Sequence, residues 1–398
     1  MLSLFSPQAL SWIRDKSGED DIEEKILPQH LNNGRWMSWK EDVFSDIFHR
    51  RVFTPLPPKE EAISMLERFF EAFNPLFPLF HQPTFMRLVE RQYSGHSHNG
   101  SGWWASLNVA LALAYMLRKM NNSHHNDDEQ KAWSFMKNAL GVLSELTVRK
   151  TDLQSVQALL GMAHFMQTTS NPQLSLPLYS AAIRVSHSIG LHRENLLLNL
   201  SPVESEVQKR VFWVGYILDQ DTSLRSGWPA AQDDSDMDMS LPDENPTDGV
   251  GDISASSGIG KCNIFRFYCE LALIQSKVHK MLYSVKASKY TSEEIRDITA
   301  VLNYELDKWK NRLPQEFRPR HVIKTVKNPL LWHVVMLHFL YHNCVMMANR
   351  SRDSSRSTVE PDTTDPQVSS SMISRIKAAR STISLLKQIP KENQIRIW

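Results

Sequence analysis

Two histidines four residues apart are the first candidates for chemistry in this 398-residue chain. His338 and His342 would share one face of a helix, which is the spacing of two-histidine metal sites. The residues between them include no acid to serve as the base of a metalloprotease, and the sequence places no third ligand. We therefore interpret both histidines as core or interface residues and predict no metal site.

An acidic run, Asp233–Asp238, is the second candidate because carboxylates can hold calcium or magnesium. No EF-hand register that fits the run has glycine at its sixth position, and Met237 stands where a helical terpene synthase needs its last carboxylate. An exposed acidic loop is the favoured interpretation. The alternative is an all-helical, magnesium-dependent enzyme that uses Asp233–Asp238 on an isoprenoid substrate. A run that faces a deep apolar cavity would favour the enzyme.

Nucleophile and phosphate-loop patterns do not support catalysis either. Ser97 misses the Gly-x-Ser-x-Gly elbow by one residue. Near Gly258 and Gly260, Ala255 stands where a phosphate loop needs its first glycine, and Cys262 replaces the Ser or Thr that holds magnesium. We predict no catalytic residue and no enzyme activity.

Composition narrows the class of protein. Lys and Arg total 45 against 44 Asp and Glu, and 41% of residues are hydrophobic, so the sequence predicts a neutral, soluble, globular chain with a large core. Three cysteines are too few for a disulfide framework or a four-cysteine zinc site, which predicts a reducing compartment. No apolar run reaches the roughly 18 residues of a membrane span, and Met1–Leu10 lacks a signal-peptide pattern.

Apolar residues recur at spacings of three and four nearly throughout, which predicts helices and no regular strands. Capping-box patterns at Thr151, Ser201 and Thr291 mark helix starts, and Gly190 is expected to end a helix. The expected helices are Glu61–Phe73, Trp103–Met120, Glu129–Leu146, Leu153–Thr168, a segment ending at Gly190, Ser201–Leu224, Asn263–Tyr283, Thr291–Arg312, Asn328–Asn349 and Met372–Leu386. Pro75, Pro78 and Pro83 are expected to break the chain after the first of these.

The predicted fold class is therefore all-α: an irregular multi-helix domain with a long acidic, Gly/Ser-rich loop near residues 230–261 and a disordered segment near 351–370. We expect four regions: an N-terminal, partly disordered extension 1–58, a helical domain 59–349, a disordered linker 350–371, and a C-terminal helix within 372–398.

Several segments carry a family resemblance, in the family's order along the chain. They are Phe69–Phe85, Ala181–Arg184 with Ser188–Glu194, Lys209–Asp219, Gly227–Pro229, Leu241–Pro242, Leu337–His342 and Ala378–Arg380. Together they resemble the fungal-specific transcription factor domain, which is the middle homology region of binuclear zinc-cluster regulators. The resemblance implies a nuclear regulator of transcription for a fungal metabolic gene set, such as one for secondary metabolites.

The residues that match the family signature are assigned structural roles. They are Phe77, Pro78, Phe85, Gly190, Leu191, His192, Arg210, Phe212, Trp213, Asp219, Gly227, Pro229, His338, Tyr341 and His342. Asp219 is expected to accept hydrogen bonds from backbone amides of the next turn, and Gly227 to take a positive φ. Trp228 replaces the arginine that the family usually carries, so it is expected to act as an apolar anchor or an exposed interaction residue.

Two departures from the family bear on function. The zinc cluster needs six closely spaced cysteines, which this chain lacks, so we expect no cofactor and at most weak or partner-dependent DNA binding. The chain ends at Trp398, around where the family continues into further helices, so we expect a shortened chain. The expected partners are the transcription machinery or a related regulator, and the chain is expected to form a homodimer or heterodimer. No association with a membrane is expected. A third alternative is a dimerising co-regulator without a DNA module that titrates a full-length relative.

Overall fold

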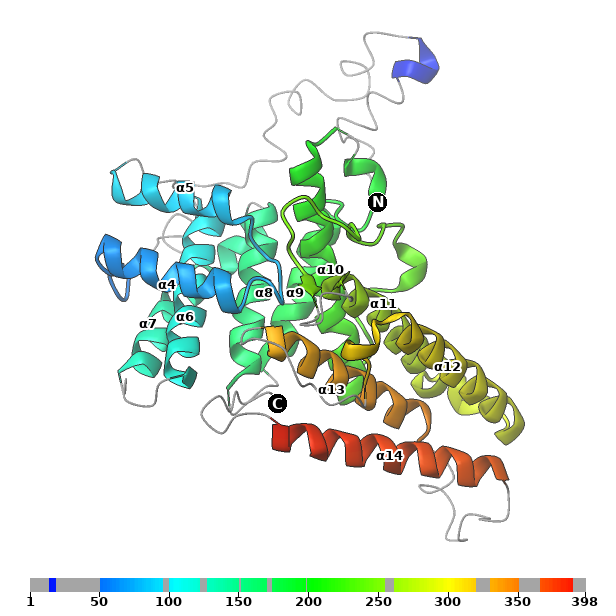
Figure 1. Cartoon of the computed structure of the whole chain (residues 1–398). Coiled ribbons are helices and arrows are strands. Elements are labelled where there is room, and N and C mark those ends of the chain that lie inside the picture. The colour runs from blue at the N-terminus through cyan, green and yellow to red at the C-terminus, as the bar shows by residue number, and fades with distance from the viewer. Residues whose placement is uncertain are drawn as a thin grey trace. The chain divides into compact units, whose positions relative to one another are not determined.

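The structure is a computed structural model, and it describes residues 14–18, 51–95, 100–121, 127–149, 152–169, 174–197, 199–254, 261–319, 330–350 and 366–388. The chain divides into two units, Met1–Arg51 and Val52–Trp398. Every element below belongs to the second unit, and labels follow Figure 1. The α-helices are α4 (Lys59–Ala72), α5 (Gln82–Tyr93), α6 (Ser101–Asn121), α7 (Asp128–Leu140), α8 (Leu153–Gln167), α9 (Ser175–Ser188), α10 (Pro202–Ser226), α11 (Ile264–Val278), α12 (Ser292–Arg312), α13 (Leu330–Ala348) and α14 (Pro366–Gln388).

Short elements connect these helices. Five are single 3₁₀ or π turns: η1 (Glu145–Arg149), η3 (Glu194–Leu197), η5 (His279–Tyr283), η6 (Lys286–Lys289) and η7 (Gln315–Phe317). A 3₁₀ turn η4 (Asp234–Asp236) and an antiparallel pair, β1 (Asp252–Ser254) with β2 (Lys261–Asn263), lie between α10 and α11. The all-α prediction is confirmed, and the hairpin is the one part of the described chain that departs from it.

Helix α6 forms the centre of the first half of the unit. It is apolar on nearly every side, so it must be surrounded, and α4, α7 and α8 pack around it while α9 covers α8. Gly161 of α8 faces Val109 of α6 so closely that a Cβ on Gly161 would lie 2.4 Å from a Val109 methyl. The small residue therefore sets the distance between these two helices.

Helix α10 joins the two halves of the unit. It contacts α8 and α9 on one side and α11 on the other, and α11 in turn packs against α12 and α13 (Figure 1). The Ser201 hydroxyl accepts the Glu204 amide hydrogen, and the Glu204 carboxylate accepts the Ser201 amide hydrogen, so the predicted capping box is confirmed. Gly227 ends the helix at φ +75°, as the glycine predicts.

Three sequence predictions need correction. The sequence predicts a break at Pro83 and no helix there, whereas Pro83 occupies the first turn of α5, where proline needs no amide hydrogen. The cap of α8 is Asp152, which accepts the Ser155 amide hydrogen, and Thr151 lies outside the described residues. Helix α14 begins at Pro366, again in a first turn, so part of the predicted disordered segment is helical. Residues 351–365, 255–260 and most of 1–50 lie outside the described residues.

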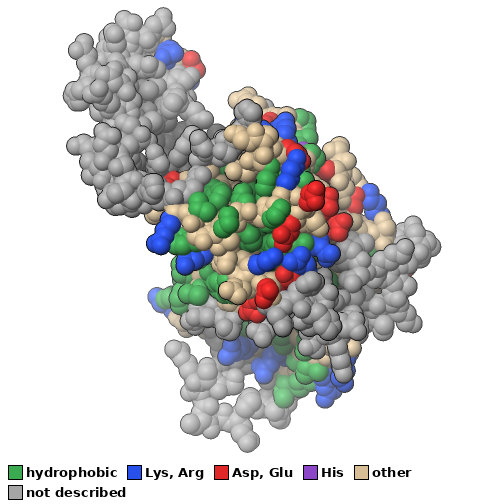
Figure 2. All heavy atoms as spheres, turned by 90° about the vertical axis from the view of Figure 1, so that its left-hand side faces the viewer, with side chains coloured by type: hydrophobic (Ala, Val, Ile, Leu, Met, Phe, Trp, Pro, Cys, Tyr) green, Lys and Arg blue, Asp and Glu red, His purple; other side chains and the backbone are tan. Residues whose placement is uncertain are grey.

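The face of the molecule on the side of α4, α5 and α7 carries a mixture of side chains. Figure 2 shows hydrophobic side chains in the middle of the described surface, with both positive and negative side chains around them. A duplex-binding surface needs a continuous basic patch, so this face does not suit nucleic acid.

Candidate effector pocket

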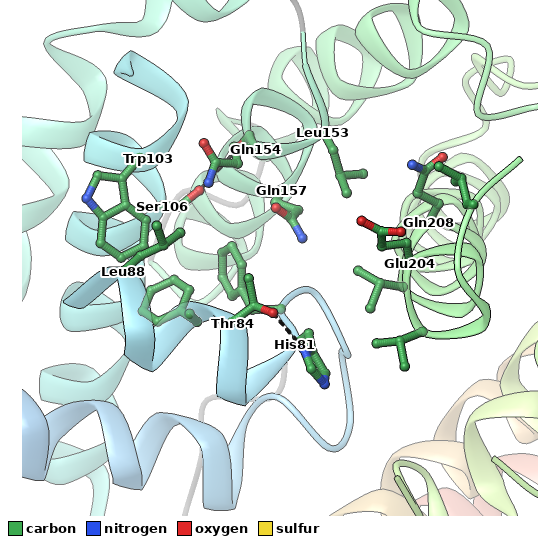
Figure 3. Close-up of a pocket in the computed structure, with 15 residues that line it drawn as sticks. His81, Thr84, Leu88, Trp103, Ser106, Leu153, Gln154, Gln157, Glu204 and Gln208 are labelled. Carbon is green, nitrogen blue, oxygen red and sulfur yellow. Dashed lines mark hydrogen bonds between the residues drawn. The ribbon is translucent and has the colours of Figure 1, made fainter. Parts of the chain in front are cut away.

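A pocket of about 240 Å³ opens where α5, α6, α8 and α10 meet, and we call it the effector pocket. Figure 3 shows side chains of α5 and α6 on one side of it and side chains of α10 on the other, with Gln157 between them. Its lining residues are Phe80, His81, Thr84, Phe85, Leu88, Trp103, Ser106, Leu153, Gln154, Gln157, Leu200, Val203, Glu204, Val207 and Gln208. Apolar atoms make up most of the wall, which is typical of small-molecule sites.

Aromatic packing fixes the wall formed by α5. Phe85 is buried with its ring 4.8 Å from Phe80 and 5.1 Å from Trp103, measured between ring centroids. The Trp103 indole donates a hydrogen bond to Gln92 on the same helix as Phe85. At the start of α5, His81 Nδ1 lies 2.9 Å from the Thr84 hydroxyl. This wall is held in place before any ligand binds.

Two glutamines of α8 are among the polar side chains that line the mostly apolar pocket. Gln157 is buried, and its amide nitrogen donates to the Leu79 carbonyl, which leaves its side-chain oxygen as a possible acceptor for a ligand. The Ser106 hydroxyl donates to the backbone carbonyl of Gln154, which ties α6 to α8 at the pocket. Few, oriented polar groups of this kind select a ligand by its hydrogen-bonding pattern.

Helix α10 supplies the rim, and its charge restricts the ligand. Hydrogen bonds from Ser201 hold the pKa of Glu204 below its usual value, so this rim carboxylate is ionised at neutral pH. Val203 and Val207 stand one turn apart on the same helix and present their methyl groups to the pocket. The negative rim disfavours anionic ligands, and the mostly apolar wall disfavours the burial of any charge.

The signature residues near the pocket mainly organise the chain that enters it. Phe77 and Pro78 are buried between α4 and α5, and Phe77 packs against His164 of α8 with 4.5 Å between ring centroids. The Asn74 side chain both donates to the Phe80 carbonyl and accepts the Phe80 amide hydrogen, which closes this loop. Of the fifteen signature residues, Phe85 alone lines the effector pocket.

A second group of signature residues fixes the turn after α9. Gly190 takes φ +79° there, and Leu191 is buried. His192 packs against His187, and burial lowers the pKa of His192.

Arg210 anchors the segment that follows α10. It is buried, donates two hydrogen bonds to the Asp248 carboxylate at 2.6 and 2.9 Å, and donates a third to Glu206. Phe212 is buried on the same helix, and the buried Trp213 indole donates to the Ser240 backbone carbonyl. These bonds hold residues 240–248 against the helix.

The end of α10 holds the start of the same segment. Asp219 accepts the amide hydrogens of Ala231 and Gln232, and burial raises the pKa of Asp219 while these two bonds oppose the shift. Its expected bonding to the following backbone is therefore present. Trp228, next to Gly227, is 60% exposed, and Pro229 is exposed as well. Trp228 therefore lies on the surface and anchors no part of the core.

The acidic run does not line the effector pocket. Asp233 accepts hydrogen bonds from the Ser235 amide and from Lys280, and Asp234 accepts from Tyr216 and Ser276. In the described part of the chain, no group of three or more His, Cys, Asp or Glu side chains could hold a metal ion. The run is a structural turn that is hydrogen-bonded to α11 and η5. This contradicts the alternative of a magnesium-dependent enzyme that uses Asp233–Asp238.

The histidines of α13 lie in the core. His338 is fully buried, with its Nε2 2.9 Å from the Phe317 carbonyl oxygen, and His342 is buried one turn later. Tyr341 stacks on Trp309 of α12 with 5.7 Å between ring centroids. The two histidines therefore belong to the packing of α13 against its neighbours.

Comparison with known proteins assigns the family. The model of the fungal specific transcription factor domain matches residues 66–317. The chain belongs to this family. It is 50% identical, over its whole length, to the ABC-transporter-regulating transcription factor of Aspergillus oryzae and 48% identical to that of Aspergillus fumigatus. It is 31% identical, over 89% of its length, to the fusaridione A cluster transcription factor of Fusarium heterosporum and covers 67% of that protein. Family and relatives are transcription regulators, not enzymes.

The chain spans 46% of the length of each Aspergillus relative, so about half. No solved structure was found to match it. The cysteines do not fit the family's six-thiolate zinc cluster, since there are three of them, with Cys269 and Cys344 buried on α11 and α13 and Cys262 in β2. Among the described helices, none is both long and apolar enough to cross a membrane.

Sequence reasoning missed the effector pocket. Its residues come from the ends of four helices and a loop, at no common spacing, and they are ordinary apolar and amide side chains. The unexpected helix α5 forms one whole wall. A signal for that wall was present in Gln82-Pro83-Thr84 followed by Phe85 and Val89 four residues apart, which fits a helix with proline in its first turn.

Proposed function

We propose that this chain is the regulatory region of a nuclear transcription regulator of this family and that its effector pocket binds a small, uncharged, largely apolar molecule. The observation that carries the proposal is the pocket's position between the α5 wall and the first turns of α10. Its 240 Å³ suits a molecule of about bicyclic aromatic size. The negative rim at Glu204 disfavours an anion, and the mostly apolar lining favours an uncharged molecule.

Helix α10 offers a route from the pocket to the surface. Val207 lines the pocket, and Arg210, about one turn further on, holds Asp248 in the segment before β1. A ligand that presses on Val203 and Val207 therefore acts on the helix that fixes this segment. A bound ligand shifts regulation only by favouring one arrangement of these parts over another.

The names of the relatives indicate which kind of gene set this chain regulates. One relative regulates ABC transporters and another a metabolite cluster, as their names state. We infer that this chain controls a fungal metabolic gene set concerned with making or moving small organic molecules. Its output is contact with the transcription machinery or a related regulator, and DNA is reached through another module or a partner.

A matched pair of variants tests the pocket. Val203 at the rim and Val301 on α12 are similarly exposed helical valines, at 46% and 51%. Val203→Trp fills the pocket, whereas Val301→Trp adds the same bulk elsewhere. We expect 2-naphthol, a neutral bicyclic fluorophore, to bind the chain and the Val301→Trp variant equally and to bind Val203→Trp at least tenfold more weakly, by fluorescence titration.

A reporter assay tests the output. The chain is fused to a heterologous DNA-binding module in a fungal host, and transcription is measured with and without 2-naphthol. We expect a response to the compound in the parent and the Val301→Trp variant and none in Val203→Trp. Equal binding by both variants, or no binding by the parent chain, would show that the pocket is not an effector site.

A further inference from the structure

Helix α14 exposes a row of apolar side chains on a face that no described element covers. Its inner face packs on α13, where Ala378 and Leu385 are buried and Leu385 meets Val335 and Phe339. The exposed row is Met372, Ile376, Ala379, Ile383 and Leu386, and its four large members are 39–59% exposed. Figure 1 shows α14 at the edge of the helical array beside α13.

The spacing of this row is that of a helix–helix seam. Successive members are four, three, four and three residues apart, which is the a/d pattern of a coiled coil. Ile373, which is 50% exposed at the flanking position after Met372, widens the row at its start, and the row contains no aromatic residue. A lipid-binding face is broader and commonly carries Trp or Phe, so the row fits a second helix better than a membrane.

The charges beside the row identify the kind of helix. In this register Arg375, Arg380 and Lys387 occupy the flanking e and g positions, and Lys377 lies outside them. Helix α14 contains no Asp or Glu. For residues 370–387, whose side chains the structure describes, no ion pair involves any of these four cations. The row is therefore bordered by positive charges that have no counter-charge among the residues the structure describes.

This charge pattern argues against a second copy of the chain. Pairing α14 with itself, in either direction, sets cations against cations across the seam, which is destabilising. We propose that the exposed face of α14 docks an amphipathic helix of a partner protein whose flanking positions are acidic. Apolar contacts supply the affinity, and the three basic flanking residues select an acidic partner.

Two synthetic peptides serve as probes of this surface. Both are three-heptad helices with leucine at the a and d positions; one carries glutamate and the other lysine at the e and g positions. Binding to the whole chain is measured by fluorescence anisotropy. We expect the acidic peptide to bind and the basic peptide to bind at least tenfold more weakly. Absence of acidic-peptide binding overturns the proposal.

Charge reversal on the same helix provides the matched control. Arg380→Glu changes a flanking position, and Lys377→Glu makes the same change outside the seam. We expect Arg380→Glu to weaken the acidic peptide about three- to fivefold and Arg375→Glu/Arg380→Glu about tenfold or more, with Lys377→Glu near the parent. Equal effects at Arg380 and Lys377 would mean nonspecific charge attraction and would overturn the proposal.

Two further measurements separate other occupants. Analytical sedimentation tests for a dimer of the chain. We expect that the double substitution Ile376→Ser/Ile383→Ser does not convert a dimer into monomers. A vesicle-binding assay tests for a lipid surface. We expect the parent chain and the double variant to bind phosphatidylserine vesicles equally. A dimer that the double substitution dissociates would assign the face to a second copy of the chain. Vesicle binding that the double substitution weakens would assign it to a lipid surface. Either outcome overturns the proposal. Circular dichroism checks that these exposed substitutions leave the fold intact.

Discussion

His333 shows at the scale of one residue how burial makes stability depend on pH. Both ring nitrogens are buried without a hydrogen-bond partner, and burial lowers the pKa of His333 from 6.5 to about 4. Between these values the unfolded chain binds a proton that the folded chain does not. The free energy of unfolding is therefore full above pH 6.5 and falls as the pH drops toward 4, by about 3 kcal/mol from this residue.

Replacing His333 with leucine should remove both the cost of its unpaired ring nitrogens and its contribution to the pH dependence of stability. His333→Leu deletes two unsatisfied polar atoms, so we expect the free energy of unfolding at pH 7 to rise by about 1 kcal/mol. The difference from the parent should widen as the pH falls from 6.5 to 4. Urea unfolding at several pH values measures this. His338→Leu is the control: it removes the bond to the Phe317 carbonyl and should lower stability at pH 7. A constant difference across the pH range would contradict the prediction.

At the scale of whole elements, the distance between α6 and α8 depends on Gly161, and a substitution there tests this. Alanine there brings a Cβ to 2.4 Å from a stiff, β-branched Val109, so α6 and α8 must separate. We expect Gly161→Ala to lower the free energy of unfolding by about 1–3 kcal/mol, measured by urea titration.

Gly215 of α10 is the matched control for this substitution. Its added Cβ would lie 3.2 Å from the flexible end of Ile183, and alanine favours a helix, so Gly215→Ala should be near neutral. If Gly161→Ala is equally neutral, Gly161 does not set the distance between α6 and α8.

The elements that sequence predicts well are those with strong local signals. The capping boxes at Ser201 and Thr291 and the glycine at 227 are all present, because each depends only on residues within one turn. Helix α5 is not predicted, because a proline in a first turn and a proline that breaks the chain look alike without the tertiary contacts. The start of α14 is predicted too late, because the composition of residues 366–370 is mostly polar. The effector pocket depends on four helix ends meeting, which no local pattern encodes.

At the scale of the molecule, the segment between α10 and α11 is held at two separate places. Asp219 binds the backbone of residues 231 and 232, near its start. Arg210 binds Asp248, whose carboxylate also accepts the Val250 amide hydrogen, near its end. The ends are joined to different turns of α10, so each can open locally while the other stays bound.

Hydrogen exchange of the two ends tests this independence. Asp248→Asn removes the charge that faces buried Arg210, and because Asp248 is 33% exposed and Glu206 still pairs with Arg210, we expect a loss of about 1.4 kcal/mol, or tenfold faster amide exchange, within residues 243–254. Residues 231–236 should exchange as in the parent. Asp219→Asn should show the reverse pattern, so each variant is the control for the other. If either substitution accelerates exchange at both ends, the segment opens as one unit, and a ligand pressing on α10 would release all of it together.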